Sequence, residues 1–250
     1  MICRLCGEEC KLIDSHIIPK WVFRYLHSID NKNKPLILLG EKENVSEKSW
    51  NGPYEKLLCE KCDNALGVYD GYAKNVFVEA KLAEAPGLQN IAWCLEGVDV
   101  TKIKLFALSL LWRMSISSHF MFLKVDLGPH ESKLRDILSF YEKGFGYFDV
   151  FITKYIYGQF GEMASKVILD PIKFKIDGIN FVRIFLPNTY ELFIKVDKRA
   201  LPSFFEPMKL GDSKNAFVIN RGEYDRSDSF NKLIEIARKH PKEISKFNSC

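Results

Sequence analysis

The sequence predicts an α+β protein: an N-terminal zinc-binding module, then a helical segment, a mainly antiparallel β region and a C-terminal helix. Three observations predict this class. Two Cys-x-x-Cys pairs lie in the first quarter of the chain. Apolar residues at helical spacing dominate the middle. From about residue 148 the sequence changes to apolar runs separated by turn signals. We expect two domains, residues 1–84 and residues 85–250, divided where Ala85-Pro86-Gly87 interrupts the pattern.

In the first domain the pattern predicts a short strand over residues 11–16 and a helix after Pro19, because proline suits the first turn of a helix. A short strand over 36–39 interrupts a polar, turn-rich segment. A helix over about 61–81 follows the second cysteine pair.

In the second domain we expect two helices, over 101–121 and 130–143, with Trp112 in the core. Strands are expected at 148–157, 166–176, 181–186 and 192–196. Asp177-Gly178 is a hairpin turn signal and Pro187-Asn188 marks another turn. An amphipathic helix over 229–240 closes the chain, with Ser229 as its N-cap.

The composition excludes several classes of protein. A chain of 250 residues with 47% hydrophobic content can bury a substantial core without a metal. No uncharged apolar run approaches the roughly 18 residues that span a bilayer, so no membrane partner is expected. Seven cysteines, an odd number, together with the lack of an export signal favour reduced thiols in the cytoplasm. The net charge of +4 permits contact with nucleic acid without demonstrating it.

The two cysteine pairs predict a metal site. Zinc prefers a tetrahedron of soft ligands, and thiolates two residues apart in a knuckle turn fit that geometry. The predicted ligands of a structural Zn²⁺ are Cys3, Cys6, Cys59 and Cys62. The alternative is that the pairs are unrelated core or redox cysteines. A closed site of four thiolates leaves no position for water, so any chemistry must come from residues that the zinc positions. Cys10 is expected to be a neighbour of the site.

Ser15-His16-Ile17-Ile18-Pro19 after the first pair and Leu57-Leu58-Cys59 before the helix resemble the zinc-stabilised HNH endonucleases. The pattern is also similar to a group of uncharacterised bacterial proteins. The first resemblance implies a treble-clef (ββα-metal) module over residues 1–80. It also implies hydrolysis of phosphodiester bonds in DNA or RNA, with His16 as general base and Mg²⁺ or Mn²⁺ as the catalytic cation.

The chain departs from the family pattern at three positions. Ser15 stands where the family has an acidic or histidine ligand, Tyr54-Glu55-Lys56 replace the middle asparagine, and the last histidine is missing. Asp14 can substitute for the first of these, because residues i and i+2 of a strand point the same way. Asp63 or Asp70, on one face of the following helix, can bind a hard cation, and Asp70 is the preferred ligand.

These departures leave two functions open. The first is a metal-dependent endonuclease with His16, Asp14 and Asp70 as catalytic residues. The second is a non-catalytic zinc-binding module that binds nucleic acid or a protein partner. In the second case His16 makes internal hydrogen bonds or ligates zinc, and Ser15 can cap the helix after Pro19. The excess of positive charge over residues 11–34, which includes Lys20 and Arg24, either grips phosphates beside His16 or is an ordinary solvated helix face.

Overall fold

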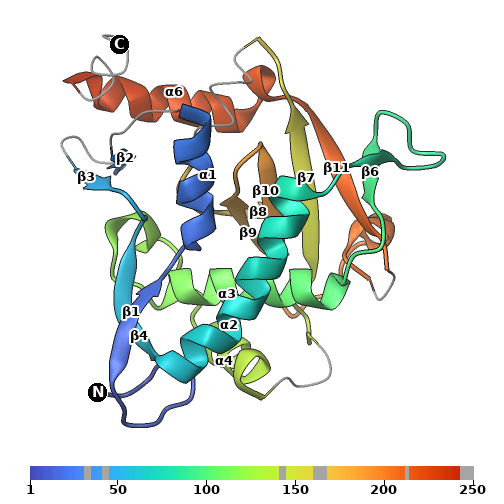
Figure 1. The fold of residues 1–250 in the computed structure, drawn as a ribbon. Helices are drawn as coiled ribbons and strands as arrows, with labels where there is room; N and C mark the ends of the chain where they lie inside the picture. Colours follow the sequence, from blue (N-terminus) through green and yellow to red (C-terminus); the bar gives the residue numbers. More distant parts are fainter. Residues whose placement is uncertain (31–34, 41–44, 141–144, 160–167, 212–213, 243–250) are drawn as a thin grey trace.

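The computed structural model describes residues 1–30, 35–40, 45–140, 145–159, 168–211 and 214–242 (Figure 1). It is a mixed α+β structure with one large sheet and a C-terminal helix, as the sequence predicts. Its strands are β1 (Leu12–His16), β2 (Leu36–Leu39), β3 (Ser46–Ser49), β4 (Tyr54–Cys59), β5 (Ala83–Glu84), β6 (Ala92–Leu95), β7 (Val150–Ile156), β8 (Ile172–Ile176), β9 (Ile179–Phe185), β10 (Tyr190–Lys195) and β11 (Ala216–Glu223). Its α-helices are α1 (Lys20–Asp30), α2 (Glu60–Lys74), α3 (Val100–Ser115), α4 (His130–Phe140) and α6 (Asp228–Lys239).

The N-terminal part is built on two antiparallel strands followed by a helix. Strand β1 pairs with β4, and α2 begins at the residue after β4. Figure 1 shows the two strands side by side, with α1 continuing from the end of β1. The predicted strand over 11–16 and the helix after Pro19 are confirmed. Strand β3 lies in the segment, residues 30–53, that the sequence predicts to be polar and turn-rich, and β4 follows directly after it.

The large sheet has the strand order β5-β6-β11-β7-β10-β9-β8. Every pairing in it is antiparallel except that of β11 with β7. Asp177 and Gly178 form the predicted turn between β8 and β9, both with positive φ, as such hairpin turns require. Strand β5 ends at the predicted domain boundary and pairs with β6, so the sheet takes in residues from both sides of that boundary.

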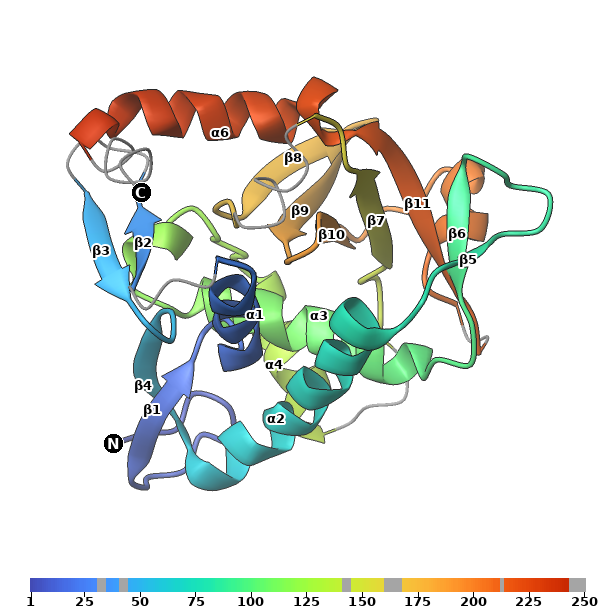
Figure 2. The same cartoon turned by 45° about the horizontal axis from the view of Figure 1, so that its top comes forward.

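Both faces of this sheet are covered, which explains why β10 is buried along its whole length. One face, with Ile152, Leu192 and Val218, packs in the same apolar cluster as α2 and α3. The other face carries Phe151 and Phe193 under the 3₁₀ turn Ser203–Met208, and its far end is covered by α6. Figure 2 shows α6 on one side of the sheet and α2, α3 and α4 on the other.

A single apolar cluster joins the metal-binding part to the sheet. It includes Cys3 and Leu58 from the N-terminal part, Phe106 from α3 and Val218 from the sheet. Helix α3 is buried on all sides, as expected for a helix at the centre of a core. Trp112 is buried in it, as predicted. The N-terminal module is therefore packed against the rest of the chain.

Several element boundaries differ from the prediction. The helix predicted over 101–121 ends at Ser115. A turn follows it, and then a short 3₁₀ segment, Phe120–Phe122. Helix α2 ends at Lys74 and passes into a π-helical turn, Asn75–Glu79. The strand predicted over 166–176 begins at Ile172; residues 166 and 167, and 141–143 of the predicted helix, lie outside the described residues.

The predicted N-cap of the last helix is wrong. Ser227 Oγ accepts the N–H of Phe230 at 3.0 Å and caps α6. Ser229 lies two residues further along the chain and is fully buried, and its hydroxyl donates to Glu191 at 3.0 Å. Serine is a favourable N-cap residue at either position. Because the hydroxyl of Ser229 bonds Glu191, a residue distant in sequence, Ser227 serves as the N-cap.

Candidate metal centre and active site

The four predicted cysteine ligands come together. The Sγ atoms of Cys3, Cys6, Cys59 and Cys62 all lie within 4.8 Å of one another. Zn–S bonds of about 2.3 Å place tetrahedral sulfurs about 3.8 Å apart, so the group can hold a metal ion such as Zn²⁺. Cys3 and Cys6 come from the N-terminal turn, Cys59 ends β4 and Cys62 lies in the first turn of α2.

Local backbone geometry positions the first pair. Gly7 has φ +76° and donates its N–H to the Cys3 carbonyl at 2.9 Å, which closes the knuckle. The N–H of Arg4 reaches Leu57 O at 3.0 Å and ties the knuckle to β4. The N–H of Cys59 lies 3.4 Å from Cys3 Sγ. Burial opposes ionisation of the Cys3 thiol, but backbone N–H groups outweigh it and lower its pKa to about 7. The Cys3 thiol therefore favours the thiolate form that binds metals, whereas burial raises the pKa of Cys62.

The other described cysteines lie outside this group. Cys10 Sγ donates to the carbonyl of Glu8 at 3.4 Å and belongs to no metal-binding cluster, as expected for a neighbour of the site. Cys94 is buried in β6. Cys250 lies outside the described residues.

His16 lies at the end of β1, opposite Tyr54 of β4. Its ring is half-buried, and burial lowers its pKa. The nearby Lys20 and Arg113 lower this pKa further, whereas Asp63 and Asp70 act in the opposite direction. The imidazole is therefore neutral at physiological pH and can accept a proton. His16 is not part of the metal-binding cysteine group.

The structure places the two predicted acidic partners of His16 in different surroundings. Asp14 is exposed in β1, at a register shift in the pairing with β4. Asp70 lies in α2, where both oxygens accept hydrogen bonds from Arg113, at 2.7 and 2.9 Å. Within the described part of the chain, Asp14, His16 and Asp70 do not form a cluster of metal-binding atoms. Their predicted catalytic roles stay predictions.

Arg113 is the residue at this site that sequence reasoning missed. It is buried in α3, and besides Asp70 it donates to the carbonyl of His16 at 3.0 Å. It therefore joins α2, α3 and the end of β1 at one point. A signal was present, because an arginine within the apolar run of the predicted 101–121 helix must have an acceptor when it is buried.

Ser15, the other residue with an open role, is buried, and its hydroxyl has no partner among the described residues. It therefore does not cap α1. Glu55, where the family pattern has its asparagine region, accepts hydrogen bonds from Ser117, Ser118 and His119. These contacts join β4 to the segment after α3.

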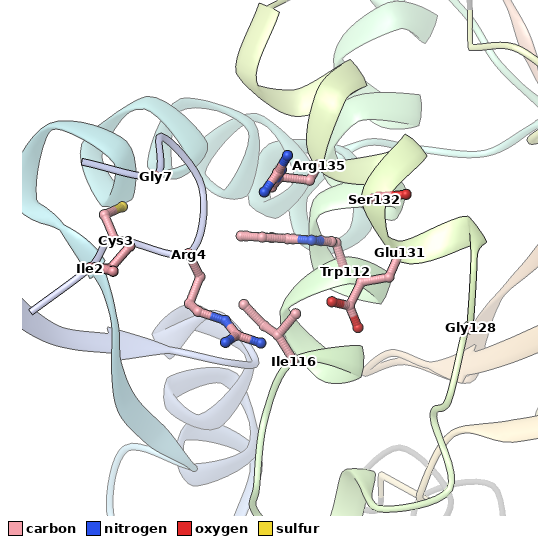
Figure 3. A pocket seen from close by; sticks show the side chains of 10 residues that line it. All are labelled: Ile2, Cys3, Arg4, Gly7, Trp112, Ile116, Gly128, Glu131, Ser132 and Arg135. Atoms are coloured by element: carbon pink, nitrogen blue, oxygen red, sulfur yellow. The ribbon is translucent and has the colours of Figure 1, made fainter. Parts of the chain in front are cut away.

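A cleft of about 380 Å³ borders the metal centre between the knuckle and the helices (Figure 3). In this view Arg4 of the knuckle and Arg135 of α4 lie on either side of the Trp112 ring. Glu131 and Ser132 line the side formed by the start of α4. Packing between the knuckle and α4 is thus incomplete at this point, and both arginines are exposed.

Comparisons with known proteins add no assignment. No protein-family model matches the chain, and no curated protein or solved structure matches it significantly. In the part of the chain that the structure describes, no helix has both the length and the apolar composition needed to cross a membrane.

Proposed function

We propose that this protein is a metal-dependent endonuclease of the HNH type, with a structural Zn²⁺ on its four cysteines. One observation carries the proposal: His16 ends β1 of an antiparallel pair that runs directly into α2, and four cysteines tie the two ends of this unit together. That order of strand, strand and helix is the arrangement that a treble-clef module requires. Zinc would fix the position of His16 and leave the chemistry to it.

His16 has the properties of a general base. Its lowered pKa keeps the imidazole unprotonated near neutral pH, so it can take a proton from a water molecule that attacks a phosphodiester. The surface of α2 at Gly67, between Asp63 and Asp70, is open, because a Cβ added there would meet nothing within 4 Å. A phosphate backbone can approach the helix closely there.

The hard cation of such an enzyme would stabilise the charge that develops on the leaving oxygen. Magnesium is usually held by one or two carboxylates together with substrate phosphates and water, so a complete protein cage is not required. Asp63 and Asp14 have no hydrogen-bond or ion-pair partner among the described residues and fit this role. Arg113 occupies both oxygens of Asp70, which makes Asp63 the better candidate on α2.

The test is cleavage of plasmid DNA and of structured RNA by the zinc-loaded protein, with Mg²⁺ or Mn²⁺ added. Loss of a general base typically costs 10²–10⁴-fold in rate, so His16→Ala should abolish detectable cleavage. His119→Gln is the matched control, because His119 pairs with Glu47 and has no contact with His16. Cleavage by His16→Ala at the wild-type rate would contradict the assignment of the base.

A second function, a non-catalytic zinc-binding module that binds nucleic acid or a protein, is favoured by one observation. Arg113 donates hydrogen bonds to Asp70 and to the carbonyl of His16. Two residues of the expected catalytic site thus help to hold the fold together. If zinc-loaded wild-type protein cleaves neither substrate with either cation, this second function replaces the first.

A further inference from the structure

Exposed aromatic side chains lie at both ends of a row of basic side chains on the surface beside His16. They come from α1, from the loop after β3 and from the start of β4. We call this surface the aromatic–basic strip; it consists of His16, Lys20, Arg24, His27, Trp50 and Tyr54. Lys20, Arg24 and His27 share one face of α1, because they are four and three residues apart. The strip therefore runs along α1 from the proposed base to Trp50.

Trp50 is held rigidly in an exposed position. Half of its surface is accessible, and its ring stacks on His27 with centroids 5.4 Å apart. The loop that carries it is closed by Ser49, whose hydroxyl bonds the N–H and the carbonyl of Gly52, at 2.9 and 3.2 Å. Gly52 has φ +82° and lies so close to Phe23 that a Cβ there would come within 2.0 Å of the ring. Folding therefore fixes a large aromatic ring at the surface, where a ligand can stack on it.

Tyr54 is a second aromatic platform, next to the proposed base. It is 55% exposed and is the β-sheet partner of His16, with the two rings 6.1 Å apart. Burial is the main cause of the lowered pKa of His16, and the positive charge of the nearby Lys20 lowers it further. An aromatic face and a cation thus flank the position where a scissile phosphate would lie.

The two cations of the strip, Lys20 and Arg24, are not paired with nearby acids among the described residues. Glu55, next to Tyr54, is occupied by Ser117 and Ser118, and Glu47 in β3 is occupied by His119. The two cations are therefore free to bind phosphates.

From these contacts we infer that the aromatic–basic strip binds single-stranded nucleic acid, with unpaired bases stacked on Trp50 and Tyr54 and phosphates on Lys20 and Arg24. This inference rests on the proposed function and names the form of its substrate. Every base has a π-face, so such stacking tolerates any sequence, whereas the bases of a duplex already stack on one another. We therefore expect a preference for unpaired over paired strands.

The experiment measures binding apart from cleavage. Wild-type protein without added divalent cation is titrated into a fluorescent 12-nucleotide DNA, the RNA of the same sequence and the matching DNA duplex. Alanine substitution of a stacking residue typically weakens binding by roughly 5- to 150-fold per base. Trp50→Ala and Tyr54→Ala should each show such a loss on single strands, and Trp50→Phe should retain most of the affinity because the aromatic face remains.

Phe204→Ala is the matched control, because Phe204 is 52% exposed and its ring contacts that of Phe205, outside the strip. It should bind like wild type. Equal affinity for duplex and single strand, or unchanged single-strand affinity in both alanine variants, would overturn the inference. The two proposals fail separately: Trp50-dependent binding without cleavage refutes only the nuclease, and cleavage without Trp50-dependent binding refutes only the strip. The DNA and RNA arms show which polymer is preferred.

Discussion

The N-terminal module and the large sheet are stabilised by different means. Among its described residues the module has only two-stranded sheets, β1–β4 and β2–β3, and such pairs are marginal in water on their own. Its strands share the main apolar cluster and are also fixed by four converging thiols and by the bond from Arg113 to the carbonyl of His16. The large sheet has seven strands with apolar cover on both faces. The difference suggests that the module depends on a few specific bonds in addition to burial, and the sheet on distributed burial.

Loss of the metal should have the largest effect and should be confined to the module. Cys59→Ser removes one of four ligands, and the apparent binding free energy of a structural zinc is about 10–16 kcal/mol in small zinc-finger peptides. We expect zinc to be lost, and amide exchange to accelerate over residues 1–80 far more than in β7, β9 and β10. Elemental analysis and hydrogen exchange check this.

Cys10→Ser is the matched control for that substitution, since Cys10 lies in the same segment but outside the cluster. It should keep its zinc. Unchanged zinc content in Cys59→Ser would refute the assignment of the four ligands. Equal acceleration of exchange in the module and in the sheet would refute the contrast between the two regions.

The second largest effect should come from Arg113, which connects the module to α3. Its side chain is 3% exposed and that of Asp70 16%, so the pair is largely shielded from water. Removing one partner of a buried pair typically costs about 3–5 kcal/mol, because the other charge is left without compensation. Arg113→Met should lower the free energy of unfolding by about that amount, measured by urea denaturation of the zinc-loaded protein.

Asp70→Asn and the double variant complete a cycle that isolates the interaction. Arg135→Met is the control, because Arg135 is exposed and its contact with Asp136 is long, at 3.7 Å. It should change stability by less than about 1 kcal/mol. Additive costs for Arg113→Met and Asp70→Asn would mean that the pair does not couple α2 to α3.

The features that could be predicted from the sequence are those set by short segments. The cysteine spacing, the strand before His16 and the helix after Pro19 each depend on a few neighbouring residues, and the structure has them as expected. The Asp177-Gly178 turn is of the same kind, because only residues that tolerate positive φ fit it.

The features that could not be predicted depend on partners distant in the chain. Arg113 and Asp70 lie 43 residues apart, and nothing local pairs them. Strand β11 contains a short apolar run followed by Asn220, Arg221 and Gly222, a weak strand pattern, and its parallel pairing with β7 stabilises it. The exposed position of Trp50 likewise depends on the contact between Gly52 and Phe23.

The smallest effect is expected in the sheet, at Glu191 of β10. This carboxylate is 1% exposed, accepts hydrogen bonds from Thr153 and Ser229, and lies 3.9 and 4.0 Å from Arg183 and Arg221. Burial raises its pKa, although both arginines oppose the shift. Ionised Glu191 is therefore less favourable in the folded protein than in water. Glu191→Gln should change stability at pH 7 by at most about 1–2 kcal/mol, far less than Arg113→Met.

The pH dependence of the effect of Glu191→Gln tests whether burial raises the pKa of Glu191. A carboxyl group whose folded pKa is raised costs no stability below its unfolded pKa of about 4.3, and its cost appears as pH rises through the folded value. The stability of wild type relative to Glu191→Gln should therefore be greatest near pH 4 and should decline towards pH 7, in paired urea denaturations. An advantage of wild type that instead grows with pH would show that Arg183 and Arg221 outweigh burial. The sheet would then depend on a specific ion group, as the module does on Arg113 and Asp70, and the contrast between the two regions would be lost.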